Sequence, residues 1–482
     1  MARGARDLIK RITAARSRGP VRCLTQTDAA EGSRIPRRPP AAPRRRSGSG
    51  WPRRDWPVWS AFLTGATPLL TSDRLPSVKT FSAAVTLLFA TLADLSAIGI
   101  RVDDQDAFGT ARGDAVTATA DNPSALYYNP AGITQLDGWQ FRLGAYGIDV
   151  DAEYHQPGGR SLHNEQNLSV APQLYTTWTP KDSRLSLGLG VYAPYGLGLE
   201  YTDDAPFRTV SKVGRINYLT VNPVAAWKFG ESLSLGFGAT VNYVETEARQ
   251  GIFQPRDEFK FRGAGTAYGF NAGVLWQPAK RHSFGVRYHS ATNAELSGHT
   301  SVHTKSFEVA TPLGPVTVPE TASEEDAGAD FQFPQFVTAG YSFRPTPDWN
   351  FEFDVDWTDW DALNQVVVRQ QSSPKIVQPF DWESGWAFEW GATRYLPRGL
   401  RASVGYVYST QVVPESRFTP AVPDGRRHIY SAGLGQETGR FTWDVAYQFA
   451  YQPSRTIGTG GPADGDYRLR AHAVSISLGV KF

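Results

Sequence analysis

DNPSALYYNPAG, residues Asp121–Gly132, is the stretch that decides the fold. Asn122 and Asn129 are suited to the N-cap position of a helix, and Pro123 and Pro130 follow at the first helical position, where the fixed φ is already helical. The stretch therefore predicts two short helices placed end to end. On spacing alone, both Asn-Pro pairs fit simple turns equally well. Downstream, the sequence alternates at period two almost to its last residue, which predicts a small plug inside a β-barrel.

The last strand shows this alternation most clearly. Strands that cross the outer membrane need about 9–11 residues, with apolar side chains toward lipid at every second position. In residues 472–482, one face carries Val474, Ile476, Leu478, Val480 and Phe482, and the other carries Ala473, Ser475, Ser477, Gly479 and Lys481. Ending on Phe482 after such a strand resembles the C-terminal segment that outer-membrane barrels present to their insertion machinery.

The same template predicts fourteen strands. They lie near 138–152, 167–179, 183–195, 216–228, 233–247, 265–277, 282–294, 333–344, 349–362, 384–396, 400–411, 427–436, 441–453 and 472–482. The connections after even-numbered strands are short and rich in turn residues, whereas those after odd-numbered strands are long and include Thr292–Phe331. Short periplasmic turns that alternate with long outer loops are typical of a transmembrane barrel. The predicted fold class is therefore an all-β transmembrane antiparallel barrel with a helical plug in its lumen.

The alternation also sorts polarity between the two predicted faces. In the ninth strand, Phe351 and Phe353 would face lipid while Glu352 and Asp354 point inward. Charge on the lipid face costs roughly 2–4 kcal/mol for Arg or Lys at the bilayer midplane, so this sorting is energetically enforced. Tryptophans near strand ends fit interfacial girdles: Trp139, Trp227, Trp276, Trp349 and Trp390.

A wider segment, DAFGTARGDAVTATADNPSALYYNPAGITQL (Asp106–Leu136), resembles the N-terminal segment of the FadL/TodX family of outer-membrane transporters. The family pattern is a small-residue run, an acidic Asp-Pro-Ser-type step and then Asn-Pro-Ala-Gly; Asn122 replaces the second acidic residue and caps equally well. The resemblance implies a fourteen-stranded barrel that passes long-chain fatty acids or other hydrophobic molecules by diffusion, with no cofactor, metal or catalytic residue. It also implies a gate in the plug, formed by Asn122, Pro123, Asn129, Pro130 and Ala131.

Apolar residues in predicted water-exposed loops suggest where a hydrophobic ligand binds. The third and fourth outer loops carry Ile252, Phe253, Phe259, Phe261, Phe307 and Leu313, and the resemblance implies a groove between these loops. Two apolar loops that shelter each other from water explain the same residues. Ile98, Ile100 and Phe108, in or near the tail before the plug, are expected to touch the ligand. Pro194, Gly196 and Gly198 weaken the third strand, where the family has a lateral opening toward the bilayer.

Composition divides the chain into a basic leader and an acidic remainder. The 482 residues include 49 Lys and Arg, of which 17 lie in residues 1–97 and 32 beyond, against 6 and 41 Asp and Glu, so the remainder has a net charge of −9. Residues 1–77 are predicted to be a disordered leader from a misplaced translation start, residues 78–97 a signal peptide, 98–137 the plug and 138–482 the barrel. The basic balance comes from the leader alone and does not predict a nucleic-acid partner. Export across the inner membrane then predicts a place in the bacterial outer membrane, with its lipid bilayer as a partner.

The alternatives to transport are a general porin or structural barrel and, third, a barrel-bound hydrolase. The single cysteine, Cys23, lies in the leader, and no G-x-S-x-G motif occurs. His155 and His163 lie among acidic residues in the first outer loop, where a hydrolytic site is conceivable, and His299 and His303 are four apart, without a helix to converge them on a metal. The chain is therefore predicted not to be an enzyme.

Overall fold

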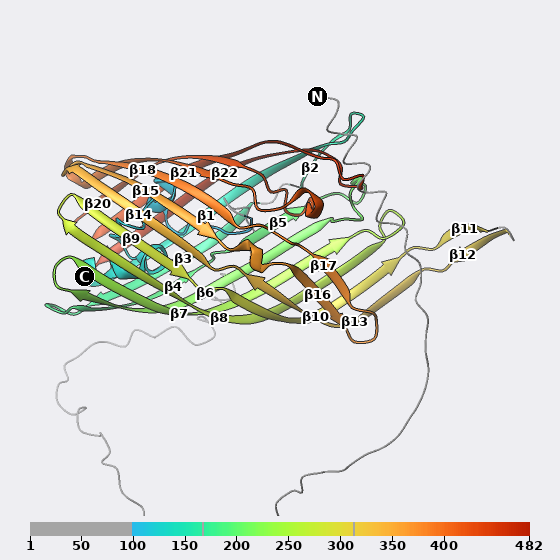
Figure 1. Cartoon of the computed structure of the whole chain (residues 1–482), viewed down its shortest axis with the longest axis horizontal. Coiled ribbons are helices and arrows are strands. Elements are labelled where there is room, and N and C mark those ends of the chain that lie inside the picture. The colour runs from blue at the N-terminus through green and yellow to red at the C-terminus, as the bar shows by residue number, and fades with distance from the viewer. Residues whose placement is uncertain (1–98, 166–167, 312–313) are drawn as a thin grey trace, which may run out of the picture. The chain divides into compact units, whose positions relative to one another are not determined.

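The computed structural model describes residues 99–165, 168–311 and 314–482. These residues form a closed antiparallel β-barrel of fourteen strands around a small helical plug (Figure 1). The predicted leader and signal peptide, together with Ile98 and Leu313, lie outside the described residues. Among the described residues, no helix is both long enough and apolar enough to cross a membrane.

The plug consists of three short helices inside the barrel. They are α3 (Ala107–Ala111), α4 (Ala125–Tyr128) and the 3₁₀ helix η2 (Pro130–Gln135). Asp106 caps α3 by accepting a hydrogen bond from the Phe108 amide. In Figure 1 the plug lies at the end of the barrel that also holds the C-terminus.

Fourteen strands build the wall, of which three are interrupted and counted once. In chain order they are β1 (Gly138–His155), β3 (Ser169–Thr179), β4 (Leu185–Tyr192) with β5 (Gly196–Glu200), β6 (Val213–Phe229), β7 (Leu233–Gln250), β8 (Glu258–Ala279), β9 (His282–His289) with β10 (Thr292–Thr304), β13 (Thr321–Phe333) with β14 (Phe336–Thr346), β15 (Trp349–Thr358), β18 (Gly385–Tyr395), β19 (Leu400–Ser409), β20 (Arg427–Thr438), β21 (Phe441–Ile457) and β22 (Gly465–Lys481). β22 pairs with β1 from Gln140↔Lys481 to His155↔Asp466, which closes the barrel.

Smaller elements lie at the outer end of the wall. They are β2 (Ser161–His163), the hairpin β11 (Phe307–Thr311) and β12 (Gly314–Val318), η3 (Trp360–Ala362), β16 (Gln365–Gln370), β17 (Ile376–Pro379) and η5 (Glu415–Arg417); η4 (Pro397–Gly399) forms one of the short turns at the other end. The β11–β12 hairpin projects beyond the rim (Figure 1).

The predicted sorting of connections by length is confirmed. Short turns, such as residues 230–232 and 439–440, join strands at the plug end, and long segments, such as 359–384, join them at the other end. One prediction about the loops is wrong: Thr292–Phe331 is mostly strand, because β10 and β13 extend the wall as a paired ladder from Thr292↔Phe333 to Thr304↔Thr321. We take the short-turn end as periplasmic.

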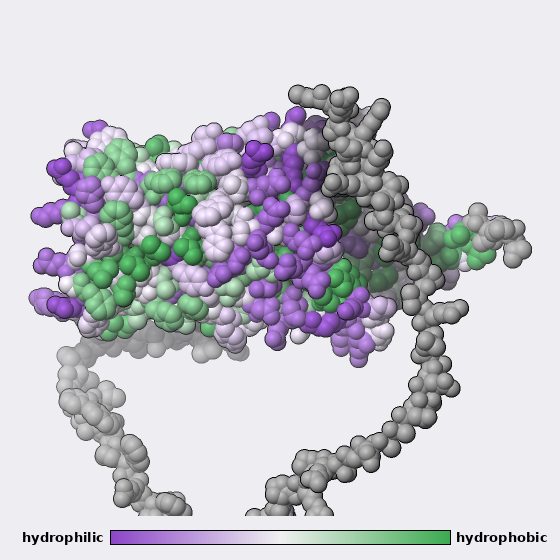
Figure 2. Space-filling model, in the orientation of Figure 1, coloured by the Kyte–Doolittle hydropathy of each residue, from purple (hydrophilic) through white to green (hydrophobic). Residues whose placement is uncertain are grey.

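The predicted facing of the strands is confirmed. In β15, Phe351 and Phe353 are exposed on the outside, whereas Glu352, Asp354 and Asp356 are buried in the lumen. Figure 2 shows apolar and weakly polar side chains over the periplasmic part of the wall and strongly polar ones toward the outer end. The strands therefore cross the membrane with their periplasmic parts and continue beyond it.

Tryptophans gather near the periplasmic ends of the strands. Trp139 and Trp178 stack with ring centroids 5.6 Å apart. Trp227 of β6 and Trp276 of β8 are about half exposed on either side of β7. This position fits an interfacial girdle. Trp390 is an exception to the prediction, since it lies in the middle of β18, between Phe353 and Tyr406 on the neighbouring strands.

Candidate functional site

Each of the two asparagines of the opening stretch binds a backbone amide as a helix cap does. Asn129 is the N-cap of η2, where its side-chain oxygen accepts from the Ala131 amide at 3.2 Å and Pro130 begins the helix. Asn122 accepts from the Ser124 amide at 2.8 Å, although α4 begins only at Ala125, later than predicted. Asn129 also donates to the carbonyl oxygens of residues 117 and 274, which ties the plug to the wall at β8.

The third wall strand is interrupted beside Pro194, and residues 99–105, which precede the plug and are called the tail below, cover the break. β4 ends at Tyr192, β5 begins at Gly196, and all residues from 192 to 197 are buried. The Val102 amide donates to the Pro194 carbonyl at 2.9 Å, and the Gly196 amide donates to the Ile100 carbonyl at 3.0 Å. The tail therefore lies against the interrupted strand as a short additional β-pairing inside the barrel.

The interruption also separates two wall strands. β3 pairs with β4 only from Leu174↔Val191 to Trp178↔Leu187, and β5 pairs with β6. On the side toward β5, residues 169–173 of β3 have no strand partner among the described residues. A strand edge in the middle of a membrane wall needs cover, because unpaired backbone groups facing lipid are costly.

A buried charged network fixes the tail and the plug to the lumen. Arg101 contacts Asp356 of β15 through two hydrogen bonds of 2.7 and 2.9 Å, and it also binds Asp103. Arg287 of β9 lies 3.5 Å from Asp103 and 3.7 Å from Asp356. All four side chains are at most 5% exposed, so each charge depends on its partners.

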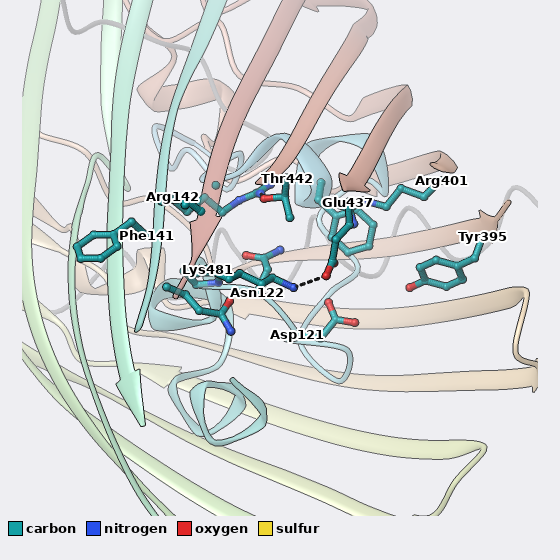
Figure 3. A pocket seen from close by; sticks show the side chains of 14 residues that line it. Asp121, Asn122, Phe141, Arg142, Tyr395, Arg401, Glu437, Thr442 and Lys481 are labelled. Carbon is teal, nitrogen blue, oxygen red and sulfur yellow. Dashed lines mark hydrogen bonds and ion pairs between the residues drawn. The ribbon is translucent and has the colours of Figure 1, made fainter. Parts of the chain in front are cut away.

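A second part of this network lies at the periplasmic end. Arg142 of β1 binds Asp106 of the plug and lies 2.8 Å from Asp444, which Arg401 also contacts at 2.7 Å. Arg142 and Arg401 border a cavity of about 130 Å³, shown in Figure 3. Its other labelled side chains include Asn122 and the ion pair Lys481–Glu437 at 2.8 Å. Phe108, one of the predicted ligand contacts, also lines this cavity, with Arg401 4.9 Å from its ring.

In contrast, the outer half of the lumen is apolar. Ile100 of the tail belongs to a continuous cluster of buried residues that spans the lumen and the loops above it. Its larger members include Tyr195, Leu197, Leu199, Tyr218, Phe331, Phe333, Trp360, Leu363 and Trp382. The lumen thus carries an apolar region on the outer side and a charged, plugged region on the periplasmic side.

The predicted loop groove is only partly assembled. Phe253 of the third loop and Phe307 of the hairpin meet with ring centroids 5.8 Å apart, and Phe253 is 68% exposed. Ile252 next to Phe253 is partly buried. The prediction that Phe259 and Phe261 belong to this loop is wrong, since both lie in β8: Phe261 is buried in the lumen cluster, and Phe259 packs against that cluster.

The histidines considered for hydrolysis or metal binding form local contacts near the outer end of the wall. His155 lies 2.7 Å from Ser161 on the neighbouring strand β2 and 2.9 Å from Glu153 on its own strand β1. His163 of β2 lies 2.6 Å from Asp151 of β1. In the described ranges, no group of three or more His, Cys, Asp or Glu side chains could hold a metal ion. His299 and His303 each pair with a single acidic residue on β10's neighbouring segments.

A closed fourteen-stranded barrel with an internal N-terminal plug defines a class of outer-membrane channel proteins. Residues 87–482 match the model of the family described as outer membrane protein transport protein (OMPP1/FadL/TodX), and the chain belongs to this family. Its place is accordingly the outer membrane. The sequence alone did not indicate the pairing of Arg101 with Asp356, because these residues are 255 positions apart and share no motif.

Similar proteins have been described by sequence and by structure. The chain is 22% identical over 411 residues to the long-chain fatty acid transport protein of Escherichia coli K12, covering 76% of this chain and 89% of that protein. The crystal structure of a Pseudomonas aeruginosa FadL homologue has a TM-score of 0.69 at 18% identity, covering 80% of this chain and 100% of the other. The Pseudomonas putida toluene transporter TodX has a TM-score of 0.63 at 15% identity, covering 82% and 100%. These structural likenesses support the same fold.

Proposed function

We propose that this chain is a passive outer-membrane channel for hydrophobic molecules such as long-chain fatty acids, and that it acts without catalysis. The observation that carries the proposal is the interrupted wall strand beside Pro194, which the tail residues Ile100 and Val102 cover from inside. A cargo that displaces the tail from the apolar part of the lumen would meet an interruption in the wall. The names of the relatives, a fatty acid transport protein and a toluene transporter, support a hydrophobic cargo.

The distribution of polarity favours a sideways exit over a path through the plug. An alkyl chain gains about 0.8 kcal/mol for each CH₂ group that it buries, so the apolar lumen attracts it. Passage toward the periplasm would require separating buried ion pairs such as Arg101–Asp356 and Arg142–Asp444, and a broken buried pair costs about 3–5 kcal/mol. A sideways exit displaces the tail and its Arg101–Asp356 contact but leaves Arg142–Asp444 in place, and we propose the interruption beside Pro194 as the lateral opening.

A general porin is less consistent with this lumen. Porins keep a polar, water-filled interior along the whole barrel. Here the outer half is packed with aromatic and aliphatic side chains, and the periplasmic half holds the plug. In the same proposal, Phe253 and Phe307 at the rim form a first contact for cargo, and Phe482 is recognised by the machinery that inserts the barrel.

The experiment is uptake of radiolabelled oleate by cells whose outer membrane lacks its own fatty-acid channel. Expression of this chain is expected to raise oleate uptake, without raising the influx of a hydrophilic sugar of similar mass. The comparison variant is the same barrel with an Asp356→Lys substitution, which adds a third cation beside Arg101 and Arg287 and is expected to displace the tail. Uptake of the sugar without any gain for oleate would establish a porin instead.

A further inference from the structure

Two arginines on the outside of the last wall strand have no ionic partner. Arg468 and Arg470 of β22 are both exposed, and in the part of the chain that the structure describes neither takes part in a hydrogen bond, an ion pair or a ring contact. Other arginines of the outer surface carry ion pairs: Arg215 with Glu200 at 3.3 Å, Arg262 with Glu245 at 2.6 Å and Arg369 with Asp330 at 2.8 Å. The two β22 arginines are therefore available to a partner outside the chain.

These arginines lie where β22 leaves the membrane. Phe441 pairs with Val480 at the periplasmic ends of β21 and β22, and Tyr451 pairs with Arg470 further along the same ladder. Between these pairs each strand uses eleven residues, 441–451 and 470–480, which is the length that a tilted strand needs to cross the bilayer. The outward-facing residues of β22 change at the same point, from Leu478, Ile476 and Val474 to His472, Arg470 and Arg468. Arg470 thus lies at the level of the lipid head groups.

An aromatic strip lies next to these cations on the membrane side. Tyr447, Phe449 and Tyr451 are the last outward-facing residues of β21 within the membrane crossing. His472 lies against this strip, since its Nδ1 atom is 2.7 Å from the Tyr447 hydroxyl and its ring centroid is 5.1 Å from that of Phe449. Tyrosines at this depth are typical of the boundary between acyl chains and head groups. The β22 patch is defined here as Arg468, Arg470, His472, Tyr447, Phe449 and Tyr451.

The acidic residues of the neighbouring strand are engaged elsewhere. Asp151 and Glu153 of β1 lie opposite the two arginines in the β1–β22 ladder. Asp151 contacts His163 at 2.6 Å, and Glu153 contacts His155 at 2.9 Å. The arginines therefore keep an uncompensated positive charge at the membrane surface, where anionic head groups attract such charges.

We propose that the β22 patch binds a phosphorylated lipid of the outer leaflet, with a phosphate held between Arg468 and Arg470. Two residues apart on one face of a strand, their Cα atoms are separated by about 7 Å, so both side chains can reach a single phosphate group. Guanidinium groups bind phosphate oxygens through paired, charge-assisted hydrogen bonds.

The aromatic strip favours a lipid over other anionic partners. An acyl chain attached to the bound head group would lie along Tyr447 and Phe449, on a face that already meets the bilayer. A soluble anion would use only the arginines, and a soluble protein would not reach the strip within the membrane. The site lies on the outside of the wall, so it does not depend on which cargo crosses the lumen.

The test measures the binding of purified lipopolysaccharide, a phosphorylated glycolipid of the outer leaflet, to the full chain in detergent. The same lipopolysaccharide after removal of its phosphates with hydrofluoric acid is the second probe. The double variant Arg468→Gln with Arg470→Gln is expected to weaken binding of the phosphorylated probe about thirtyfold, since each cation near a charged membrane surface contributes about fivefold. Binding of the dephosphorylated probe is expected to stay within about twofold.

Two further double variants serve as controls. Arg262→Gln with Arg369→Gln removes two outer arginines that already have partners, and its binding of the phosphorylated probe is expected to stay within about twofold of wild type. Arg468→Lys with Arg470→Lys keeps both charges and is expected to retain most of the binding. If the double Gln variant does not assemble, Arg470→Gln alone is expected to weaken binding about fivefold.

Three results would overturn the site. Equal losses in the two double Gln variants would show general attraction of an anionic lipid to any cation on the surface. Equal binding of both probes by the wild type would show that phosphate is not recognised. Displacement of the phosphorylated probe by inorganic phosphate at the same concentration would show a site for a free anion instead of a lipid.

Discussion

Arg101 and Asp356 form a bidentate ion pair, with nitrogen–oxygen distances of 2.7 and 2.9 Å, inside a lumen that excludes water from both side chains. The pair joins the tail that covers the wall interruption to β15 of the barrel wall. Paired guanidinium and carboxylate groups in this geometry are strong and directional. The position of the tail is therefore set by this contact as well as by its apolar packing.

Replacing Arg101 by Ala should release the tail. Removing one partner of a buried pair costs about 3–5 kcal/mol, because Asp356 keeps a buried charge. The barrel, held by its closed hydrogen-bond network, should still assemble. Limited proteolysis should then cut the tail faster in Arg101→Ala than in wild type. The control is Arg369→Ala, which removes an exposed pair with Asp330 at 2.8 Å; equal cutting of both variants would contradict this role.

The two asparagine caps should differ in their effect on the plug. Asn129 is fully buried and makes three hydrogen bonds, so Asn129→Ala should destabilise the plug by about 3 kcal/mol at roughly 1 kcal/mol for each bond. Asn122 is partly exposed, and Asn122→Ala should cost only about 1 kcal/mol. Single-channel recordings should show more frequent openings for Asn129→Ala than for Asn122→Ala. Identical recordings for both variants and wild type would mean that the plug is not the gate.

Plug stability should depend on pH through Asp104. Burial raises the pKa of Asp104 from 3.8 to about 6, and Asp114, whose pKa burial and the nearby Asp104 charge also raise, lies in the same plug. The folded plug therefore binds a proton that the unfolded segment would release, so it is most stable at low pH and loses stability as the pH rises from about 4 to about 6. Hydrogen exchange of residues 103–114, corrected for intrinsic rates, should be slower at pH 5 than at pH 8.

Asp104→Asn provides the control for this pH dependence. Gln448 donates to Asp104 at 2.8 Å, and the amide keeps an acceptor for that bond without a titratable proton. The variant should show a smaller change in protection over the same pH range, because Asp114 still titrates. A pH dependence as large as that of the wild type would assign the effect to another group.

The last residue should matter for insertion more than for the finished barrel. The Phe482 amide donates to the Trp139 carbonyl at 2.8 Å, and its ring is 65% exposed, so it contributes little packing. Deleting Phe482 should lower the amount of barrel in the outer membrane while leaving the thermal stability of the inserted fraction nearly unchanged. Phe482→Tyr should restore insertion. If the truncated protein reached wild-type levels in the outer membrane, Phe482 would not be needed for recognition by the insertion machinery.

The sequence predicts the wall well and the lumen poorly, for a physical reason. Facing lipid enforces alternation, so β15 and β22 could be placed with their faces from the sequence alone. Beyond the membrane, the outer face of β10 and β13 is polar, while Leu296 and Phe331 face the lumen cluster. A template that expects apolar residues toward lipid therefore predicts a loop here. Contacts in the lumen depend on how the barrel closes, which no local pattern encodes.

The candidate site shows the same division. The plug motif and the weak third strand were visible as Asn-Pro pairs and as Pro194 between glycine-rich strands. The tail's pairing with that strand, and the pairing of Arg101 with Asp356, follow only from the packed lumen.

The most direct test of the lateral exit uses the absence of cysteine from residues 99–482. Gly198 lies on β5 opposite Arg215, beside the strand edge left by the interruption. In Gly198→Cys, a bulky thiol reagent that forms a disulfide should lower oleate uptake, and a reductant should restore it, because the label fills the opening. The same treatment of Ala239→Cys, on the outside of β7 away from the interruption, should leave uptake unchanged. Unaltered uptake in fully labelled Gly198→Cys would contradict the lateral exit.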